Sequence, residues 1–156
     1  IPHEGKQDLE KSISRKLRAW REPGARFVVV RDNDGGDCHL LKESLAEICI
    51  AAGRPDSVVR IACQELEAWY FGEPAAMAEA FGDPRLKHIG EKARYRDSDI
   101  IPNPSREIVG LVPEFQKISG ARRIAPHLTR EGNHSRSFQV TIEAIERLFK
   151  EQQTMQ

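Results

Sequence analysis

Apolar side chains recur at helical spacing near the start of the chain and are followed by an unbroken apolar run. The spaced positions are Leu9, Ile13, Leu17 and Trp20, with lysines and arginines between them. This pattern predicts an amphipathic helix with a basic outer face over residues 5–20. The run at residues 27–30 is rich in β-branched side chains, which is typical of a strand buried on both faces.

A second apolar run, at residues 58–62, follows a stretch of helical spacing that ends near Gly53. A strand, a helix and a strand in this order predict two parallel strands joined by a right-handed crossover. We therefore expect an α/β fold built on a parallel sheet that helices cover.

The second half of the chain is predicted to be mostly helical. A short Ala-rich helix is expected over residues 73–81 and a final amphipathic helix over 138–149. Residues 82–105 carry prolines and charges with little periodicity and are expected to form an irregular surface segment, followed by short helices over 106–126. No internal repeat or boundary is visible, so residues 1–156 are expected to form a single domain.

Charge narrows the range of functions. The 156 residues include 24 lysines and arginines and 24 aspartates and glutamates, for a formal net charge of zero. This balance excludes an overall cationic attraction to nucleic acid or to anionic lipid. Residues 6–21 and 122–136 are nevertheless locally basic, which permits a local phosphate site.

The chain contains no apolar run long enough to span a membrane and no recognisable secretion signal. Its cysteines, Cys38, Cys49 and Cys63, are odd in number and widely spaced, which fits neither a disulfide framework nor a zinc site. We expect a cytoplasmic protein with reduced cysteines. Because an initiator methionine is normally kept before a bulky residue such as Ile1, we also expect the N-terminus to be truncated.

Two carboxylates stand at alternate positions after the first strand, at Asp32 and Asp34. Alternate strand residues point to the same side, and ligands bind at the carboxyl ends of parallel strands. Two converging carboxylates repel each other unless a hard cation such as Mg²⁺ or Mn²⁺ binds both. We favour such a metal site over a simple Asp-rich turn. Asp37 is equally a candidate metal ligand and a candidate N-cap of the next helix.

Two other motifs overlap this segment. An EF-hand loop would use Asp32, Asp34 and Glu43 as ligands. That interpretation is set aside because Asp37 stands where the loop needs glycine and because a strand, rather than a helix, precedes it. A phosphatase of the haloacid-dehalogenase type also begins with an apolar strand and this aspartate pair, with Asp32 as nucleophile and Asp34 as acid. No later strand that ends in paired acids accompanies the pair, and the phosphatase remains an alternative.

Glu65 and Glu67 follow the second strand directly. If the chain stays extended they share a face, whereas if it turns helical at once they diverge by about 200° and only one reaches a metal. Because they end the neighbouring strand, both are candidate metal ligands and candidate catalytic residues, as are Asp32 and Asp34. Lys117 is a further candidate catalytic residue.

Several basic and small polar residues could hold a phosphate group. A helix N-terminus with serine, asparagine and arginine side chains favours anions. The candidates for binding phosphate or nucleic acid are Lys6, Arg122, Arg123, Asn133, Ser135, Arg136 and Ser137. Taken alone, each is better explained as a helix cap or a solvated charge.

Taken together, the motifs resemble a bacterial domain-of-unknown-function family, number 4276, which is regarded as Toprim-like and related to the RloG proteins. The motifs that carry the resemblance are Gly5-Lys6, Asp32-x-Asp34-x-x-Asp37-Cys38, Glu65-Leu66-Glu67-Ala68-Trp69-x-x-Gly72, Tyr95-Arg96-Asp97, Ala121-Arg122-x-Ile124-Ala125-Pro126-His127 and Asn133-x-Ser135-Arg136-Ser137-Phe138. They extend over nearly the whole chain.

The resemblance implies a Toprim-like three-layer fold and a Toprim-type metal site. In that scheme Asp32 and Asp34 match the aspartate pair that holds Mg²⁺. Glu65 or Glu67 would be a ligand of a second metal ion. Toprim domains also begin with a strand that ends in a functional glutamate. In this family that strand lies upstream of the Gly5-Lys6 motif, so we expect it to be missing from a chain that starts at Ile1.

These observations lead to three hypotheses of function. The first is a Mg²⁺- or Mn²⁺-dependent nuclease domain that cleaves nucleic-acid phosphodiesters, with DNA favoured over RNA. The resemblance further implies a role in phage defence together with an ATPase partner. The second is a non-catalytic Toprim-like interaction or regulatory module, which the neutral charge and the aromatic content of 6% support. The third is the haloacid-dehalogenase-like phosphatase.

Overall fold

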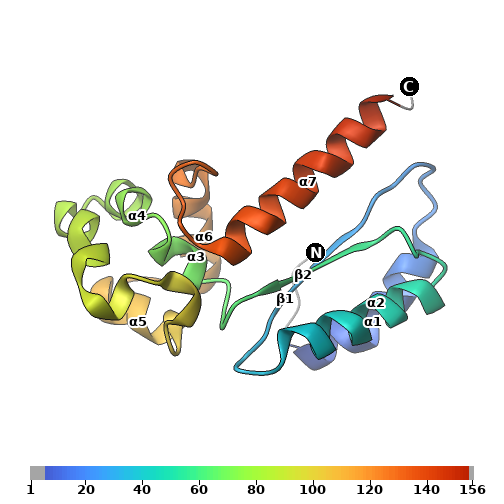
Figure 1. Cartoon of the computed structure of the whole chain (residues 1–156), viewed down its shortest axis with the longest axis horizontal. Helices are drawn as coiled ribbons and strands as arrows, with labels where there is room; N and C mark the ends of the chain where they lie inside the picture. The colour runs from blue at the N-terminus through green and yellow to red at the C-terminus, as the bar shows by residue number, and fades with distance from the viewer. Residues whose placement is uncertain (1–5, 155–156) are drawn as a thin grey trace.

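The computed structural model describes residues 6–154, with side chains from Asp8 onward, and is mostly helical around a small parallel sheet (Figure 1). The helices and strands are α1 (Lys6–Ala19), β1 (Val28–Asp32), α2 (Cys38–Ala51), β2 (Val58–Ala62), α3 (Ala68–Phe71), α4 (Pro74–Phe81), α5 (Pro104–Leu111), α6 (Lys117–Ile124) and α7 (Arg136–Thr154). Short 3₁₀ helices lie at Pro84–Glu91, Ala93–Tyr95, Ser98–Ile100 and Ala125–His127. None of the helices in the described part of the chain is long and apolar enough to cross a membrane.

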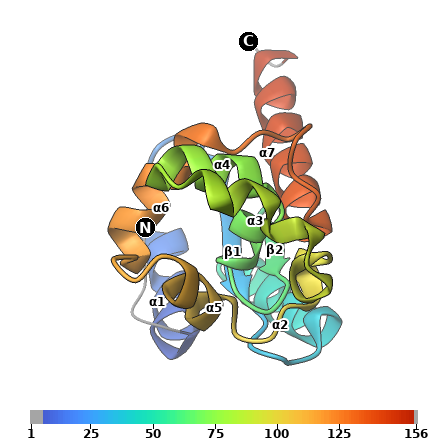
Figure 2. The ribbon, with the colours of Figure 1, turned by 90° about the vertical axis from the view of Figure 1, so that its left-hand side faces the viewer.

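The sheet consists of β1 and β2, which pair in parallel from Val28 opposite Val58 to Asp32 opposite Ala62. The crossover helix α2 packs beside α1 on one side of the strands, and α7 lies against β2 on the other (Figure 1). The predicted α/β class and parallel pairing are therefore confirmed, with two strands in the sheet among residues 6–154. Both strands run their carboxyl ends toward α3, α4 and α5, which stand in front of them in Figure 2.

Two apolar clusters hold the molecule together. The smaller cluster joins α1 and α2 to the sheet and contains Ile13, Leu17, Val29, Leu45, Cys49, Ala52 and Val59. The larger one is built mainly from elements that follow β2, and its most deeply buried members include Met77, Ile101, Ile108 and Ile124, each at most 1% exposed. The sheet therefore lies between two separately packed regions, and its strand ends lie at the junction.

The segment 82–105 differs from its expected irregular surface character. It forms 3₁₀ turns and buries Leu86, Ile89, Tyr95 and Ile101 in the larger cluster. A 3₁₀ helix has three residues per turn and occurs in short pieces, so its apolar positions match neither helical nor strand spacing. The prediction from periodicity was wrong here for that reason.

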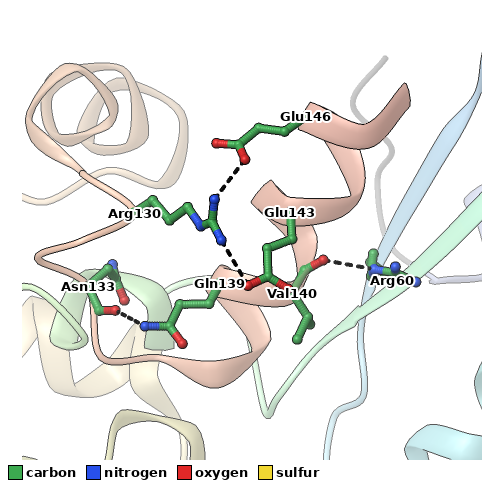
Figure 3. A network of polar contacts seen from close by, with 7 residues as sticks. All are labelled: Arg60, Arg130, Asn133, Gln139, Val140, Glu143 and Glu146. Atoms are coloured by element: carbon green, nitrogen blue, oxygen red, sulfur yellow. Dashed lines mark hydrogen bonds and ion pairs between the residues drawn. The ribbon is translucent and has the colours of Figure 1, made fainter. Parts of the chain in front are cut away.

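Polar contacts tie α7 to the rest of the fold (Figure 3). Arg60 of β2 donates from Nε to the Val140 carbonyl at 3.2 Å, which joins the helix directly to the sheet. Just before α7, Arg130 reaches forward to Glu143 at 3.1 Å and Glu146 at 2.9 Å. Such half-exposed ion pairs contribute little energy, but together with the buried face of α7 they orient its first turns over the strand ends.

Candidate functional site

Hydrogen bonds join the loop after β1 to the loop after β2. The Asn33 N–H donates to the Ala62 carbonyl at 3.2 Å, and the Asp34 N–H donates to the Gln64 carbonyl at 3.1 Å. The Gln64 N–H donates in turn to Asn33 Oδ1 at 2.6 Å. Asp34 and Gln64 both adopt left-handed backbone angles, with φ of 49° and 63°. Because such angles are unfavourable for residues other than glycine and concentrate at functional sites, they mark these loops as a candidate site.

Asp32 is the last residue of β1 and lies at the centre of this site. Its Oδ1 accepts a hydrogen bond from the Leu66 N–H at 2.8 Å. Burial raises the pKa of Asp32 to about 6; the Leu66 hydrogen bond opposes this shift, while the carboxylates of Glu67 and Asp34 add to it. Asp32 is therefore a carboxylate that loses much of its hydration and lies near others of the same charge.

Glu67 and Lys117 complete the centre of the site. Glu67 is 5% exposed, and Lys117, the first residue of α6, places its Nζ 3.4 Å from Glu67 Oε1. Partial burial lowers the pKa of Lys117, but the carboxylates of Glu67, Glu65 and Asp32 outweigh it and raise the pKa overall. This ion pair holds Lys117 only loosely, because the Lys117 side chain is 65% exposed.

The two glutamates after β2 diverge, which resolves the alternatives left open by the sequence. The chain turns at Gln64 and enters α3, so that Glu67 faces Asp32 while Glu65 turns toward α5. There Glu65 Oε2 accepts the Ser105 N–H at 2.7 Å. Glu65 stays close enough to Lys117 to affect its pKa, but its hydrogen bond anchors the start of α5.

Asp37 is placed apart from this centre and caps α2. Its Oδ1 accepts the N–H groups of His39 at 2.8 Å and Leu40 at 3.1 Å. These bonds, the one from Leu40 foremost, hold the pKa of Asp37 below its usual range. Of its two predicted roles, the structure provides the helix N-cap.

Three of the predicted phosphate-binding side chains are buried and already have hydrogen-bond partners within the protein. Asn133, Ser135 and Ser137 are at most 5% exposed. Asp99 accepts hydrogen bonds from Ser135 Oγ at 2.6 Å and from the Ser137 N–H at 3.1 Å. Trp69 Nε1 donates to Ser137 Oγ at 2.7 Å. In this group, which we call the Asp99 network, the protein's own carboxylate holds the first turn of α7 where a phosphate was expected.

The predicted basic residues are spread over the surface. Arg123 donates to the Ala80 carbonyl at 2.9 Å and lies over the Phe81 ring at 4.8 Å, so it fastens α6 to α4. The side chains of Arg122 and Arg136 are exposed and make no hydrogen bond or ion pair with the residues that the structure describes. The side chain of Lys6 lies outside the described residues.

The donor set at the strand ends has the chemistry that Mg²⁺ needs. Among residues 6–154, no three histidine, cysteine, aspartate or glutamate side chains come close enough together to hold a metal. Mg²⁺, however, commonly binds one or two protein carboxylates and takes its other ligands from water and substrate phosphates. Asp32 has one oxygen without a hydrogen bond to any described residue, and Asp34 and Glu67 lie near it. These residues fit such a site.

One residue of the site escaped the sequence prediction. Tyr70 is 3% exposed, and its pKa is raised by burial, by Glu67 and by Asp32. In the sequence it stands in an apolar, aromatic stretch, which predicts core packing. The signal that could have found it is its spacing of three residues from Glu67, which places both on one side of a helix.

Neither a protein-family model, nor a curated protein, nor a solved structure matches this chain. The resemblance to a Toprim-like family therefore stays a prediction, and the function rests on the geometry of the strand ends.

Proposed function

We propose that this chain is a Toprim-like, Mg²⁺- or Mn²⁺-dependent nuclease domain that cleaves nucleic-acid phosphodiesters, with DNA as the favoured substrate. The observation that carries the proposal is the convergence of Asp32, Glu67 and Lys117 from three separate segments at the carboxyl ends of parallel strands. That edge is where α/β sheets bind their ligands. A cytoplasmic role in phage defence with an ATPase partner belongs to the same proposal.

In this proposal Asp32 and Asp34 hold the metal ion, and Glu67 is a further ligand. When bound, the ion supplies charge stabilisation to the phosphate and activates a water molecule. Lys117 binds a phosphate oxygen, because its exposed ammonium group is held only at 3.4 Å by Glu67 and is free to turn. The buried setting of Glu67 and Tyr70 excludes water from one side of the site, which strengthens every charge interaction there.

The test is cleavage of supercoiled plasmid DNA by the purified protein in Mg²⁺ or Mn²⁺, with Asp32→Asn as the main variant. Asparagine keeps the oxygen that accepts the Leu66 N–H but removes the charge. We expect at least a 100-fold loss of cleavage and a loss of Mn²⁺ binding by calorimetry, since a preorganised charge at the reacting centre contributes effects of about this size.

Asp37→Asn is the matched control. It removes a neighbouring charge in the same loop, and asparagine is as good an N-cap as aspartate, so we expect full activity. If Asp32→Asn cuts and binds Mn²⁺ like the unmodified protein, the proposal is wrong. A chain that binds no divalent ion supports the interaction module instead, and hydrolysis of small phosphomonoesters with a phosphorylated Asp32 supports the phosphatase.

A further inference from the structure

The side-chain amide of Asn33 lies between the two loops that carry the candidate metal ligands. Its Oδ1 accepts the Gln64 N–H at 2.6 Å and the Gly35 N–H at 3.4 Å. Its Nδ2 donates to the Gly36 carbonyl at 3.2 Å. The oxygen thus faces two N–H groups and the nitrogen faces a carbonyl, which is the pattern that an amide can satisfy. An aspartate at this position would lack the donor, and an alanine would lack both groups.

Gln64 is the residue whose backbone this amide holds. Its φ of 63° is left-handed, a conformation that costs free energy for a residue with a long side chain. The Gln64 N–H donates to Asn33 Oδ1, and the Gln64 carbonyl accepts the Asp34 N–H at 3.1 Å. Hydrogen bonds from the loop after β1 therefore offset the strain at Gln64 from both sides, and the Asn33 side chain makes the shorter one.

The conformation of Gln64 determines the direction in which the chain leaves β2. Two residues later, the Leu66 N–H donates to Asp32 Oδ1 at 2.8 Å. Glu67 comes next, with its Oε1 3.4 Å from Lys117 Nζ. If Gln64 took an ordinary backbone conformation, its φ would change sign and the following residues would leave the strand in another direction. The contacts of Asp32 and Glu67 therefore depend on the left-handed turn.

We propose that Asn33 is the positioning residue of the strand-end site: by holding Gln64 in its left-handed conformation, it sets the arrangement of Asp32 and Glu67 that binds the metal ion. The inference rests on the proposed function, since it names the residue that preorganises that same site. Both ends of the Asn33 amide are engaged within the protein, so Asn33 acts through its neighbours and is not itself a ligand.

The first measurement is Mn²⁺ binding to the whole chain by calorimetry, without substrate. Asn33→Ala removes the amide, and we expect about tenfold weaker binding, because loss of a group that orients metal ligands has effects of about 10- to 100-fold. Asn103→Ala is the matched control. Asn103 also lies in a loop, and its side chain caps no helix, so we expect unchanged Mn²⁺ affinity. Circular dichroism verifies that both variants are folded at the temperature of the titration.

A rescue variant separates positioning from a general loss of stability. Glycine adopts left-handed backbone angles without strain, so Gln64→Gly removes the need for the bond that Asn33 provides. We expect the double variant with Asn33→Ala and Gln64→Gly to bind Mn²⁺ within about threefold of the unmodified protein. A double variant that binds Mn²⁺ as weakly as Asn33→Ala alone would contradict the proposed role of Asn33.

Amide hydrogen exchange followed by NMR gives a measurement that needs no variant. If the hydrogen bond between Asn33 and Gln64 favours metal binding, metal binding must favour this bond by the same factor. We therefore expect saturating Mg²⁺ to slow exchange of the Gln64 amide by about tenfold. The Gly53 amide, which donates to the Ile50 carbonyl at 2.9 Å at the far end of α2, is the control and should exchange at an unchanged rate.

The outcomes separate this inference from the proposed function. If Asn33→Ala binds Mn²⁺ as tightly as the unmodified protein, or if Mg²⁺ binds and leaves exchange of the Gln64 amide unchanged, the inference is wrong and the nuclease proposal stands. If the unmodified protein binds no divalent ion, both are wrong. Because the exchange rates are read on the unmodified protein, they decide the matter even if Asn33→Ala folds poorly.

Discussion

Two groups of polar side chains lie near the strand ends, and each is centred on one aspartate. In the Asp99 network both carboxylate oxygens accept hydrogen bonds, from Ser135 Oγ and from the Ser137 N–H. In the candidate site Asp32 accepts one bond, from the Leu66 N–H, and faces Glu67 and Asp34. Asp99 has a donor from its own chain for each oxygen, whereas Asp32 has one donor and lies near two further carboxylates, with the Lys117 ammonium as the basic group of the site.

This difference separates a structural acid from a candidate ligand-binding acid. A buried polar group with all its partners stabilises one conformation, whereas a partly satisfied one costs stability and persists where function needs it. The contrast predicts that removing the two aspartates changes stability in opposite directions. The following substitutions test that contrast, from the largest expected effect on stability to the smallest.

Asp99→Ala is expected to destabilise the protein by about 3 kcal/mol. It removes the acceptor at the first turn of α7 and leaves Ser135 and Ser137 without it, and a lost cap and an unmet buried group each cost about 1–2 kcal/mol. Urea unfolding followed by circular dichroism measures the change. Asp56→Ala, which breaks the exposed ion pair with Arg26, is the control and should cost less than 1 kcal/mol. If Asp99→Ala and Asp56→Ala lower the free energy of unfolding by the same amount, Asp99 is not a structural acid and the contrast with Asp32 fails.

Gly72→Ala is expected to cost about 2 kcal/mol, because it forces apart the contacts behind the Asp99 network. A Cβ at Gly72 would lie 2.1 Å from Asn133 Oδ1, and Asn133 donates to the Trp69 carbonyl at 2.8 Å. Overpacking of this kind costs about 1–3 kcal/mol. Gly110→Ala in α5 meets nothing within 4 Å and should be neutral or slightly stabilising. The melting temperatures of both variants are measured by thermal unfolding. Equal melting temperatures would contradict this prediction.

Asp32→Asn is expected to stabilise the metal-free protein at pH 7.5 by about 1–2 kcal/mol. The pKa of Asp32 rises from 3.8 to about 6 on folding, so the folded state binds its proton more tightly. The penalty for ionising Asp32 is therefore absent below about pH 4, grows between pH 4 and 6, and is complete above pH 6. The full shift corresponds to about 3 kcal/mol, which partial contact with water reduces.

The measurement is urea unfolding of Asp32→Asn and the unmodified protein at pH 4 and pH 7.5 in a chelating buffer. The two proteins should have equal stability at pH 4 and differ at pH 7.5. A variant that is less stable at pH 7.5 would mean that Asp32 belongs with Asp99 as a structural acid, and the comparison would fail.

Local patterns in the sequence were enough to predict the helices and strands around the sheet. The apolar run at 58–62 matches β2, and the helical spacing that ends near Gly53 matches α2. These patterns depend on how side chains a few positions apart share a face, so they can be read without knowing the fold. The 3₁₀ turns of residues 82–105 could not be read in this way, because their spacing has no distinctive period.

The sequence by itself determined the parallel strands and the acidic residues that follow them, since both depend on neighbours along the chain. Only the tertiary structure decided which of these acids converge. It turned Glu67 toward Asp32 and Glu65 toward Ser105, and it brought in Lys117 from α6. It also paired Ser135, just before α7, and Ser137, in its first turn, with Asp99. These choices depend on residues that lie 35 to 50 positions apart along the chain, where no local spacing records which side chains will meet.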